Sequence, residues 1–579
     1  MSKKKTKPPV RPASEPAGPP APGFCGATLI PFLARRSLVL AAGLIALAST
    51  RIVSTYSEMS PTWDEPGHMA CGLQYLAQHV YRYEAQHPPL ARVMSALGPY
   101  LAGARPMGIK NQDQEGVAVM YRDGHPERML TRMRLGILPF FVAAAFVVWL
   151  WARRHFGNAV AALATGLFTL VPTVLAHAGL ATTDMPLTAC LSAAFFALLL
   201  WAEEPTSRHS LLLGAATALA VVSKFTALGY LPAAALFAFL AYLMVERPTV
   251  DAVVAAAKAR AWPAAIALFT GAIAVWAVYS FSFGKVSAWN VSFGNGTAWK
   301  VSLPAPELFD GVSFAMYHNT KGHAAFFMGE IRNTGWWYFF PVLLAVKTPL
   351  AWLAAVGFGL AAWWGRRAQL AYWMPVAFAA GILLPGMTSH VNIGLRHILP
   401  VFTGLAILAG LGLMRLLERA ARTKWAGPLA AVLVLWVAVS GALQHPDYLS
   451  YFNELAGSTP ERIVVDSDLD WGQNTIRLQR RLRELGAAQV AFTDMNLYPN
   501  HLMIWPGLPL VRNLDAFRPV EGWTAVSPTL WMLRRYGLST RALSVPPWWA
   551  YYHRVEKVGT LWLYYVPPGS LRQTLPGGR

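Results

Sequence analysis

Cysteine is scarce in this chain, and its scarcity limits the folds and sites that the chain can form. The 579 residues include three cysteines, Cys25, Cys71 and Cys190. They lie far apart and lack the short spacing of metal ligands, and no disulfide framework is visible. Cys190 falls within an apolar run, where a buried thiol is the ordinary interpretation. The sequence therefore predicts neither a disulfide-stapled fold nor a cysteine-ligated metal.

Charge is also scarce, and most of it is positive. Charged residues make up 13% of the chain and hydrophobic residues 55%, with 49 Lys and Arg against 29 Asp and Glu. So little charge excludes an array of soluble domains, and the recurring long apolar runs are typical of a multi-span membrane protein. The net charge of +20 does not indicate nucleic-acid binding, because the basic residues lie mainly in short loops and in the N-terminal tail.

Hydropathy predicts about eleven membrane spans of roughly 20 residues each. They are expected near residues 37–53, 133–151, 158–178, 185–202, 210–223, 228–245, 262–282, 337–364, 369–386, 397–415 and 425–443. In this scheme the basic loops share one side with the N-terminal tail: Arg153–Arg154, Arg247 to Arg260, Arg366–Arg367 and Arg415 to Lys424. The positive-inside rule then places the N-terminus in the cytoplasm and the C-terminal segment outside the inner (plasma) membrane.

The chain divides into three parts on this interpretation. Residues 1–35 form a basic, Pro-rich tail that we expect to be disordered, and the following run is an uncleaved anchor because it lacks a small-residue cleavage site. Residues 36–443 hold the spans and two long outer loops, 54–132 and 283–336. Residues 444–579 are expected to form a small extracytoplasmic α/β domain.

Local sequence patterns support helices and strands in these outer regions. The segments HMACGLQYLAQHV and LARVMSALGPYLAG have the 3.6-residue spacing of amphipathic helices lying along a membrane. After residue 444, NTIRLQRRLRELG predicts a basic helix, and AAQVAFTDM and GTLWLYYV predict strands. No internal repeat is evident, which weighs against a transporter built from inverted halves.

Acidic residues gather in the predicted outer loops. WDEPGH contains the adjacent carboxylates Asp64 and Glu65 together with His68, and TTDMPL places Asp184 in a very short loop between spans. An acid at that depth is a functional-site hypothesis by default. Capping of a helix start is the structural alternative for both motifs. In DSDLDWGQ, three aspartates and Trp471 could grip a sugar or an acceptor, or could cap the basic helix that follows.

Cations lie at or inside the predicted outer ends of spans. Arg134 opens the second span, Lys347 lies about three turns into a long apolar helix, and Arg396 and His397 precede another span. Snorkelling to lipid headgroups is the structural alternative for such residues. Lys224, between two short spans, is a weaker candidate for a functional cation. In QHPPLARV, His87 precedes a rigid Pro-Pro turn, and the helix that follows carries Arg92. The structural alternative for this motif is an ordinary turn followed by a solvent-exposed arginine.

Carboxylates and cations meeting at headgroup level would suit a reaction on a lipid-linked anion. Sugar transfer from a lipid phosphate resembles glycoside hydrolysis in its oxocarbenium-like transition state. The phosphate leaves as a stable anion, so no general acid is needed, and one carboxylate can act as general base on the acceptor hydroxyl. Arginine and lysine would hold the departing phosphate.

These motifs together resemble the GT-C superfamily of membrane glycosyltransferases, in the protein O-mannosyltransferase and aminoarabinose transferase branch. WDEPGH resembles the Asp-Glu motif of the first outer loop, QHPPLAR the His-Pro-Pro-Leu-Gly-Lys motif, and TTDMP a second-loop acidic motif. FFMGEIRNTGWWYFFPVLLAVKTPL, NIGLRHILPVF, and YFNELAG followed by DSDLDWGQ resemble later segments of bacterial members. The resemblance covers about residues 36–500 and departs from the family at Ala91 and Arg92, which replace Gly-Lys.

The resemblance implies a GT-C-like catalytic region over residues 36–443 and roles for individual residues. Asp64 would be the catalytic base or an acceptor-positioning carboxylate, with Glu65 beside it and Asp184 completing the acidic site. Contacts to the donor phosphate would come from Arg92, Arg134, Lys347 and Arg396, and further substrate contacts from His68, His87, His397, Asp470 and Trp471. The donor would be a polyprenyl-phosphate-linked sugar, and the acceptor a glycolipid, polysaccharide or protein on the extracytoplasmic face. No cofactor is required; a divalent metal, which some members bind, stays an open alternative, although no ligand set predicts one.

Two other functions stay open. A transporter or flippase should place its ionisable residues along a mid-membrane path, whereas most acids here lie in outer loops. A membrane scaffold with a partner-binding outer domain would leave the Asp64 and Asp184 loops without a common purpose.

Overall fold

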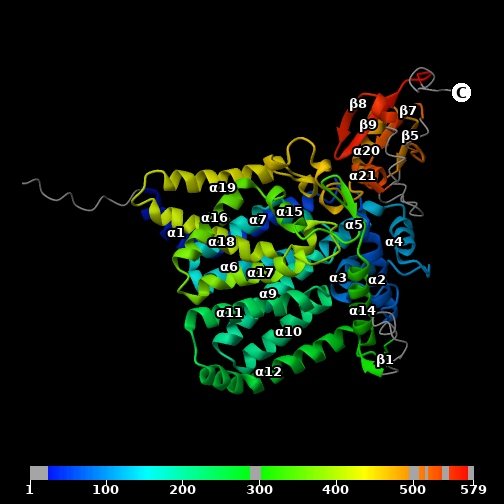
Figure 1. Cartoon of the computed structure of the whole chain (residues 1–579). Coiled ribbons are helices and arrows are strands. Elements are labelled where there is room, and N and C mark those ends of the chain that lie inside the picture. The colour runs from blue at the N-terminus through cyan, green and yellow to red at the C-terminus, as the bar shows by residue number, and fades with distance from the viewer. Residues whose placement is uncertain (1–23, 287–301, 494–506, 516–519, 538–546, 571–579) are drawn as a thin grey trace, which may run out of the picture.

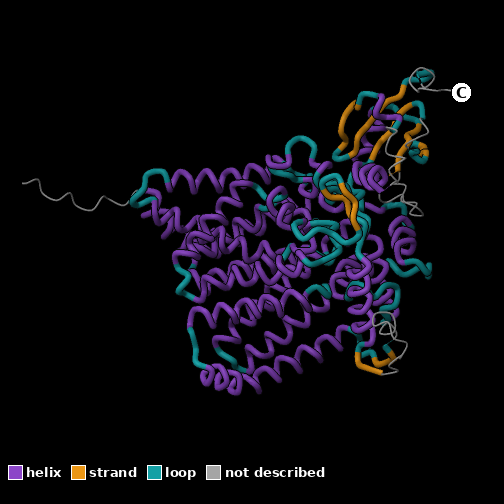
Figure 2. The backbone as a smooth tube through the Cα atoms, in the orientation of Figure 1, coloured by secondary structure: helices purple, strands orange, loops and turns teal. Residues whose placement is uncertain are grey.

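The protein is mainly α-helical, with a small sheet region near the C-terminus (Figures 1 and 2). The computed structural model describes residues 24–286, 302–493, 507–515, 520–537 and 547–570. Apolar helices lie side by side in a bundle, and shorter helices, hairpins and the C-terminal sheet gather at one end of it. This is the predicted class of a polytopic helical membrane protein with a small C-terminal α/β region.

The bundle consists of helices that are apolar over most of their surface. In chain order they are α1 (Phe24–Ser54), α6 (Leu138–Phe156), α7 (Asn158–Leu170), α9 (Asp184–Glu203), α10 (Ser207–Ser223), α11 (Ala227–Glu246), α12 (Val250–Val278), α16 (Leu350–Gly365), α17 (Leu370–Met387), α18 (Val401–Arg419) and α19 (Ala426–Leu443). Within the described residues, eight helices are long and apolar enough to cross a membrane, or ten if each of two bent pairs is one span. Helix α10, with 17 residues, is not among these ten; it corresponds to the fifth predicted span, 210–223.

Two predicted spans are broken rather than continuous. Helix α7 meets α8 (Pro172–Ala178) at 68°, and α15 (Phe339–Val346) meets α16 at 114°. A proline lies at each break: Pro172 is the first residue of α8, and Pro349 directly precedes α16. Proline cannot donate the backbone hydrogen bond that would continue a helix. The placement of Lys347 three turns into one long helix was therefore wrong. Lys347 lies at the C-cap of α15, in the break.

Small residues allow the central helices to pack closely. Helices α16 and α18 touch at Gly359, where an added Cβ would lie 1.9 Å from the carbonyl oxygen of Leu408, and at Gly412, where it would lie 2.1 Å from that of Ala355. Without water to drive apolar faces together, helices in a membrane associate through such close backbone contact. The two glycines thus fix the approach of α16 to α18.

The predicted basic loops share one end of the bundle. Arg154 pairs with Glu203 at 2.8 Å, Arg260 donates to the carbonyl oxygen of Ala202 at 2.8 Å, and the ring of Phe156 lies 5.1 Å from that of Tyr372. Glu203 ends α9, whose first residue is Asp184. Since a 20-residue helix spans about 30 Å, the basic loops lie a full bundle length from Asp184.

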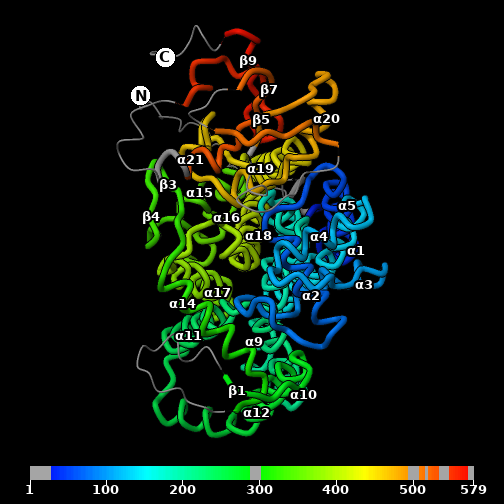
Figure 3. The backbone as a smooth tube through the Cα atoms, turned by 90° about the vertical axis from the view of Figure 1, so that its right-hand side faces the viewer, coloured from blue at the N-terminus to red at the C-terminus, as the bar shows by residue number. Residues whose placement is uncertain are grey.

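The opposite end carries the helices of the first outer loop (Figure 3). They are α2 (Asp64–Gln78), α3 (Pro89–Leu101), α4 (Gln112–Tyr121) and α5 (Pro126–Leu135). Helices α2 and α3 coincide with the two segments predicted as amphipathic helices. The later outer segment adds the hairpin β1 (Phe283–Lys285) and β2 (Ser302–Pro304), the helix α14 (Pro306–Lys321), and the hairpin β3 (Ala325–Phe327) and β4 (Glu330–Arg332).

The C-terminal region forms a mixed sheet in the order β6-β5-β7-β9-β8. Strand β5 (Gln489–Thr493) is parallel to β6 (Leu510–Arg512) and β7 (Gly522–Val526), and β9 (Leu561–Val566) is antiparallel to β7 and to β8 (Arg554–Val558). The helices α20 (Thr475–Glu484) and α21 (Pro528–Gly537) accompany it. The predicted basic helix and both predicted strands, β5 and β9, are confirmed. The prediction did not include β6, β7 and β8.

Candidate functional site

Four charged residues from four helix ends meet in one cluster, which we call the acid–base chain: Lys224, Asp184, Arg396 and Asp64. Asp64 is the first residue of α2 and Asp184 the first of α9, while Lys224 is the C-cap of α10. Arg396 lies in a 3-10 turn, η1 (Leu395–Ile398), just before α18. The cluster therefore joins the first outer loop to three parts of the bundle.

Short ion pairs link the four residues in order. Lys224 Nζ lies 2.6 Å from Asp184 Oδ1, and Arg396 Nη1 lies 3.7 Å from Asp184 Oδ2. The same Nη1 donates to Asp64 Oδ2 at 2.8 Å. Two cations thus balance two carboxylates at a site that is largely removed from water.

Neither carboxylate caps its helix. The N-cap of α2 is Trp63 and that of α9 is Thr183, and neither end has a side-chain capping bond. The capping alternative for Asp64 and Asp184 was therefore wrong, because both side chains turn to the cations instead.

Exposure distinguishes the two carboxylates. The side chain of Asp64 is 23% exposed, whereas that of Asp184 is fully buried. In the described part of the chain, Asp64 accepts a hydrogen bond through Oδ2 only, and Arg396 donates through Nε and Nη1 only. One oxygen of Asp64 and one amino group of Arg396, Nη2, thus stay open for an incoming molecule.

The C-terminal region holds Arg396 from the other side. Arg396 Nε donates to Ser467 Oγ at 3.2 Å, and the guanidinium carbon lies 4.1 Å from the centre of the Trp471 ring. Trp471 is buried, so its ring is a platform for Arg396 more than a surface for a substrate.

The three aspartates of DSDLDWGQ have different surroundings. Asp470 accepts hydrogen bonds from Ser527 and Thr560 and so ties the segment to the sheet region. Asp468 accepts from the backbone N–H of Leu395 at 3.2 Å. None of the three caps α20, because its N-cap is Asn474 and carries no side-chain capping bond. The capping alternative is wrong here too.

Asp466 and Asp468 both lie within electrostatic reach of Arg396, and Asp466 is the less buried of the two. It is half-buried and adopts φ 61°, a left-handed conformation that a non-glycine residue seldom takes. Burial raises the pKa of Asp466 to about 7, helped by the negative charges of Asp64 and Asp468 and opposed by Arg396. The sequence singled out the trio but gave no reason to separate Asp466 from its neighbours.

Glu65 and Arg134 form a closed buried pair. Arg134 Nε and Nη2 each donate to one oxygen of Glu65 at 2.9 Å, and both side chains are fully buried. Glu65 also accepts from the backbone N–H groups of Thr62 and Ala181 at 2.8 Å. With its oxygens already satisfied, Glu65 is placed to fix the start of α2 rather than to meet a substrate.

Arg92 lies at the centre of a second cluster, separate from the acid–base chain. It donates to His68 Nδ1 at 3.0 Å and to the hydroxyl of Tyr81 at 2.9 Å, and it pairs with Glu84 and His87. Burial and the adjacent Arg92 charge hold the pKa of His68 well below its usual range. Burial raises the pKa of Glu84, but the Arg92 charge outweighs it and brings the value well below the usual range. The donors of Arg92 are thus already engaged within the protein.

The ammonium group of Lys347 is likewise bound by groups within the protein. It donates to the backbone carbonyl oxygens of Leu449, at 2.7 Å, and of Asp468, and it lies 4.4 Å from the centre of the Phe452 ring. It therefore braces the segment that carries Asp466.

His397 lies within the electrostatic reach of the acid–base chain. Burial, together with the positive charges of Lys224 and Arg396, lowers its pKa well below the usual range, so the ring is neutral. Its Nε2 is buried and has no hydrogen-bond partner within the described ranges. His397 can thus offer a neutral polar contact to a molecule at this site.

A metal site does not fit the residues around the cluster. Among the described residues, no group of three or more His, Cys, Asp or Glu side chains could hold a metal ion. The carboxylates of Asp64 and Asp184 are instead neutralised by Lys224 and Arg396. We therefore derive no step through a metal.

The structure brings some predicted site residues together and separates others. Asp64, Asp184 and Arg396 meet, with His397 and Trp471 beside them. Lys224, which sequence reasoning ranked low, completes the cluster; a lysine between two apolar runs was its only signal. Glu84 was missed, although an acid three residues before His-Pro-Pro is a visible signal.

Comparison with known proteins gives one family match and several distant structural similarities. The profile described as dolichyl-phosphate-mannose-protein mannosyltransferase matches residues 130–260, a segment that contains Arg134, Asp184 and Lys224. No curated protein matches this chain. The match confirms the predicted resemblance to GT-C glycosyltransferases of the protein O-mannosyltransferase type over that segment.

Among solved structures, ArnT from Cupriavidus metallidurans bound to undecaprenyl phosphate is 15% identical, with a TM-score of 0.46 over 90% of this chain and 97% of that chain. The oligosaccharyltransferase AglB from Archaeoglobus fulgidus, in complex with an inhibitory peptide and a dolichol phosphate, is 13% identical, with a TM-score of 0.42 over 70% and 55%. The S. cerevisiae protein O-mannosyltransferase Pmt1-Pmt2 complex, bound to the sugar donor, is 16% identical, with a TM-score of 0.34 over 45% and 35%. Similarities this distant do not by themselves assign an activity.

Proposed function

We propose that this protein is a membrane glycosyltransferase that moves a sugar from a polyprenyl-phosphate carrier to an acceptor hydroxyl at the extracytoplasmic face. The observation that carries the proposal is the acid–base chain, in which Lys224, Asp184, Arg396 and Asp64 are joined by ion pairs. The family match over residues 130–260 points to the same chemistry.

Asp64 is the general base in this proposal. It is the more exposed carboxylate of the chain, and Arg396 holds one of its oxygens while the other stays open. That oxygen can accept the proton of an acceptor hydroxyl as the hydroxyl oxygen attacks the sugar carbon. Attack from the face opposite the phosphate would invert the configuration at that carbon.

Arg396 and Lys224 stabilise the leaving phosphate. Each cation has donors beyond those that bind Asp64, Asp184 and Ser467. As the carbon–oxygen bond breaks, negative charge develops on the phosphate oxygen, and fixed cations in a poorly hydrated site favour that charge. Asp184, fully buried between the two cations, is a positioning residue that sets their separation.

The remaining predicted residues have supporting roles in the proposal. Glu65 and Arg134 hold the start of α2, and therefore Asp64, in place. Lys347 fixes the segment that lies against Arg396. The basic loops at the far end of the bundle would face the cytoplasm and the acid–base chain the outer face, in agreement with the positive-inside rule.

A transporter or flippase fits less well. Its ionisable groups should follow a path near the middle of the membrane, whereas Asp64, Asp184, Lys224 and Arg396 lie at helix ends on one side of the bundle.

The test compares envelope glycolipids and glycoproteins by mass spectrometry from cells with the gene, without it, and with the Asp64→Asn variant. We expect a hexose- or pentose-sized mass increment that disappears without the gene and with Asp64→Asn, since loss of a general base costs about 10²- to 10⁴-fold in rate. Asp123→Asn, an exposed change in the same outer loop, is the matched control and should restore the product.

Two results would contradict the proposal. Full product with Asp64→Asn, at wild-type protein levels, would remove Asp64 as the base. Identical glycan profiles with and without the gene, alongside a changed distribution of a lipid-linked sugar across the membrane, would favour the flippase.

A further inference from the structure

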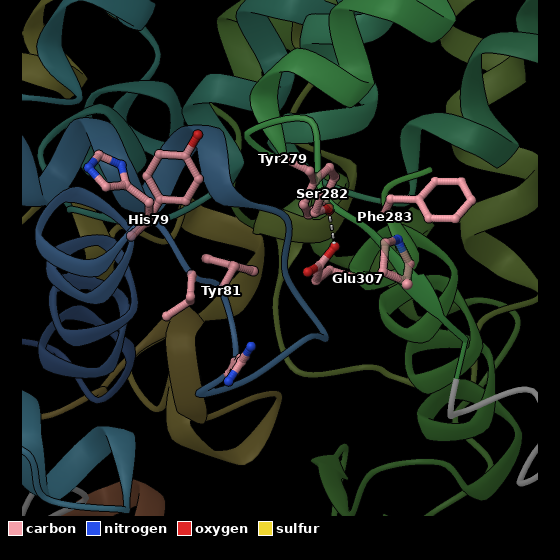
Figure 4. A pocket seen from close by; sticks show the side chains of 11 residues that line it. His79, Tyr81, Tyr279, Ser282, Phe283 and Glu307 are labelled. Atoms are coloured by element: carbon pink, nitrogen blue, oxygen red, sulfur yellow. Dashed lines mark hydrogen bonds between the residues drawn. The ribbon is translucent and has the colours of Figure 1, made fainter. Parts of the chain in front are cut away.

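A pocket of about 340 Å³ lies at the far end of α2 from Asp64. Figure 4 shows its two walls: His79 and Tyr81 belong to the end of α2 and the loop that follows, and Tyr279, Ser282, Phe283 and Glu307 come from the opposite side. Tyr75 and Arg82 also line it. A volume in this range is typical of small-molecule sites.

Tyr279 lines the pocket with its aromatic ring. The residue is 3% exposed, and its hydroxyl has no hydrogen-bond partner within the described ranges. Because its hydroxyl oxygen has almost no accessible surface, a ligand in the pocket meets the ring of Tyr279 rather than the hydroxyl. The ring of Tyr279 is fixed by an edge contact with Tyr81, at 6.4 Å between ring centres.

Other groups of the lining are held in place by the protein. Ser282 donates to Glu307 at 2.6 Å, which leaves the second carboxylate oxygen of Glu307 for a donor from outside. Tyr75 donates to the carbonyl oxygen of Val278 at 2.7 Å, and Tyr81 accepts from Arg92 at 2.9 Å. The pocket is thus preformed, and its Tyr81 wall is shared with the Arg92 cluster.

The lining selects by charge and shape. It contains one arginine and one glutamate, so its formal charge is balanced, and four of its side chains are Tyr or Phe: Tyr75, Tyr81, Tyr279 and Phe283. A phosphate would meet the Glu307 carboxylate, and an acyl chain would leave the second oxygen of Glu307 without a donor. An uncharged ring that carries hydroxyls on its edge and C–H groups on its face suits this combination.

We infer that this pocket binds an uncharged, hydroxyl-rich glycan portion of the acceptor, remote from the point of transfer. Tyr75 lies eleven residues after Asp64 on the same helix, about 16 Å along its axis, a distance that several linked sugar rings span. The identification of the glycan as the acceptor rests on the proposed function, whereas glycan binding itself does not.

The test measures binding of a defined probe to the full-length protein in nanodiscs. The probe is the neutral oligosaccharide fraction that mild acid releases from envelopes of cells that lack the gene. Saturation-transfer NMR measures its binding. We expect wild-type protein to bind it, Phe283→Ala to weaken binding roughly three- to tenfold because a stacking ring is lost, and Glu307→Gln tenfold or more. Phe314→Ala and Glu330→Gln, both exposed and outside the lining, are the matched controls and should bind as wild type does.

Failure of this inference differs from failure of the proposed function. No binding, equal binding by wild type, Phe283→Ala and Glu307→Gln, or preference for the anionic oligosaccharide fraction would overturn the pocket assignment. Asp64→Asn should bind the probe normally. If Asp64→Asn also kept full transfer while the pocket variants lost binding, the general base would be wrong and the glycan pocket would stand.

Discussion

At the residue scale, adjacent residues of one type have different roles because their surroundings differ. Asp64 and Glu65 are neighbours in sequence, yet one keeps an open oxygen and the other is enclosed by Arg134, Thr62 and the backbone of Ala181. Loss of Glu65 would leave a buried arginine without its partner, which is a stability defect. Loss of Asp64 would remove a reactive oxygen. Two neighbouring acids that look equivalent in the sequence therefore have different roles in the structure.

Lys224 provides a residue-scale prediction on carrier binding. Lys224→Gln should weaken the affinity for undecaprenyl phosphate roughly ten- to a hundredfold, because a charge-assisted hydrogen bond to phosphate is lost. Intrinsic tryptophan quenching on titration with undecaprenyl phosphate measures it. Lys258→Gln, an exposed change at the far end of the bundle, should leave the affinity unchanged; equal affinities for wild type and Lys224→Gln would remove Lys224 from the phosphate site.

Asp466 gives a prediction on pH dependence. Its raised pKa, about 7, means that the carboxyl is neutral below this pH and ionised above it, where it competes with phosphate for Arg396. Wild-type affinity for undecaprenyl phosphate should therefore fall, relative to Asp466→Asn, as the pH rises from 6 to 8. The lipid phosphate also ionises near pH ~6, but it does so equally for both proteins, so the ratio of their affinities isolates Asp466. A ratio that is constant across this range would contradict the assignment.

At the scale of elements, breaks and ends of helices place the chemistry. Asp64, Asp184 and Lys224 stand at ends of α2, α9 and α10, and Arg396 lies in the short turn before α18. Side chains there can converge without interrupting the backbone hydrogen bonds of a helix in a membrane. The bend at Pro349 likewise lets Lys347 reach the C-terminal segment.

Close packing of α16 on α18 gives an element-scale prediction. Gly359→Ala should lower the free energy of unfolding by about 1–3 kcal/mol, because its Cβ would overlap the backbone of Leu408 and overpacking costs that much. Gly357→Ala, two residues away with nothing within 4 Å of its added Cβ, is the matched control. Unfolding by SDS titration in mixed micelles measures both, and equal stabilities would mean that the helix contact is not rigid.

At the scale of the whole molecule, charge is separated along the bundle. Basic loops gather at one end, where Arg154 pairs with Glu203, and the acid–base chain lies at the other. The C-terminal region shares the second end, and its segment before α20 contacts the first outer loop, because Ser60 donates to the carbonyl oxygen of Gly472 at 2.9 Å. Segments more than 400 positions apart in the sequence therefore pack against each other at this end of the bundle.

The sequence alone determined the membrane class, the approximate span positions and the amphipathic helices α2 and α3, because hydrophobic periodicity is a local property. It also pointed to Asp64, Asp184 and Arg396. Only the tertiary structure decided which charges meet. It joined Lys224 to Asp184 and Asp466 to the surroundings of Arg396, and it enclosed Glu65, Arg134 and Lys347. A side chain's chemistry depends on its desolvation and its partners, and these are set by segments far away in the chain.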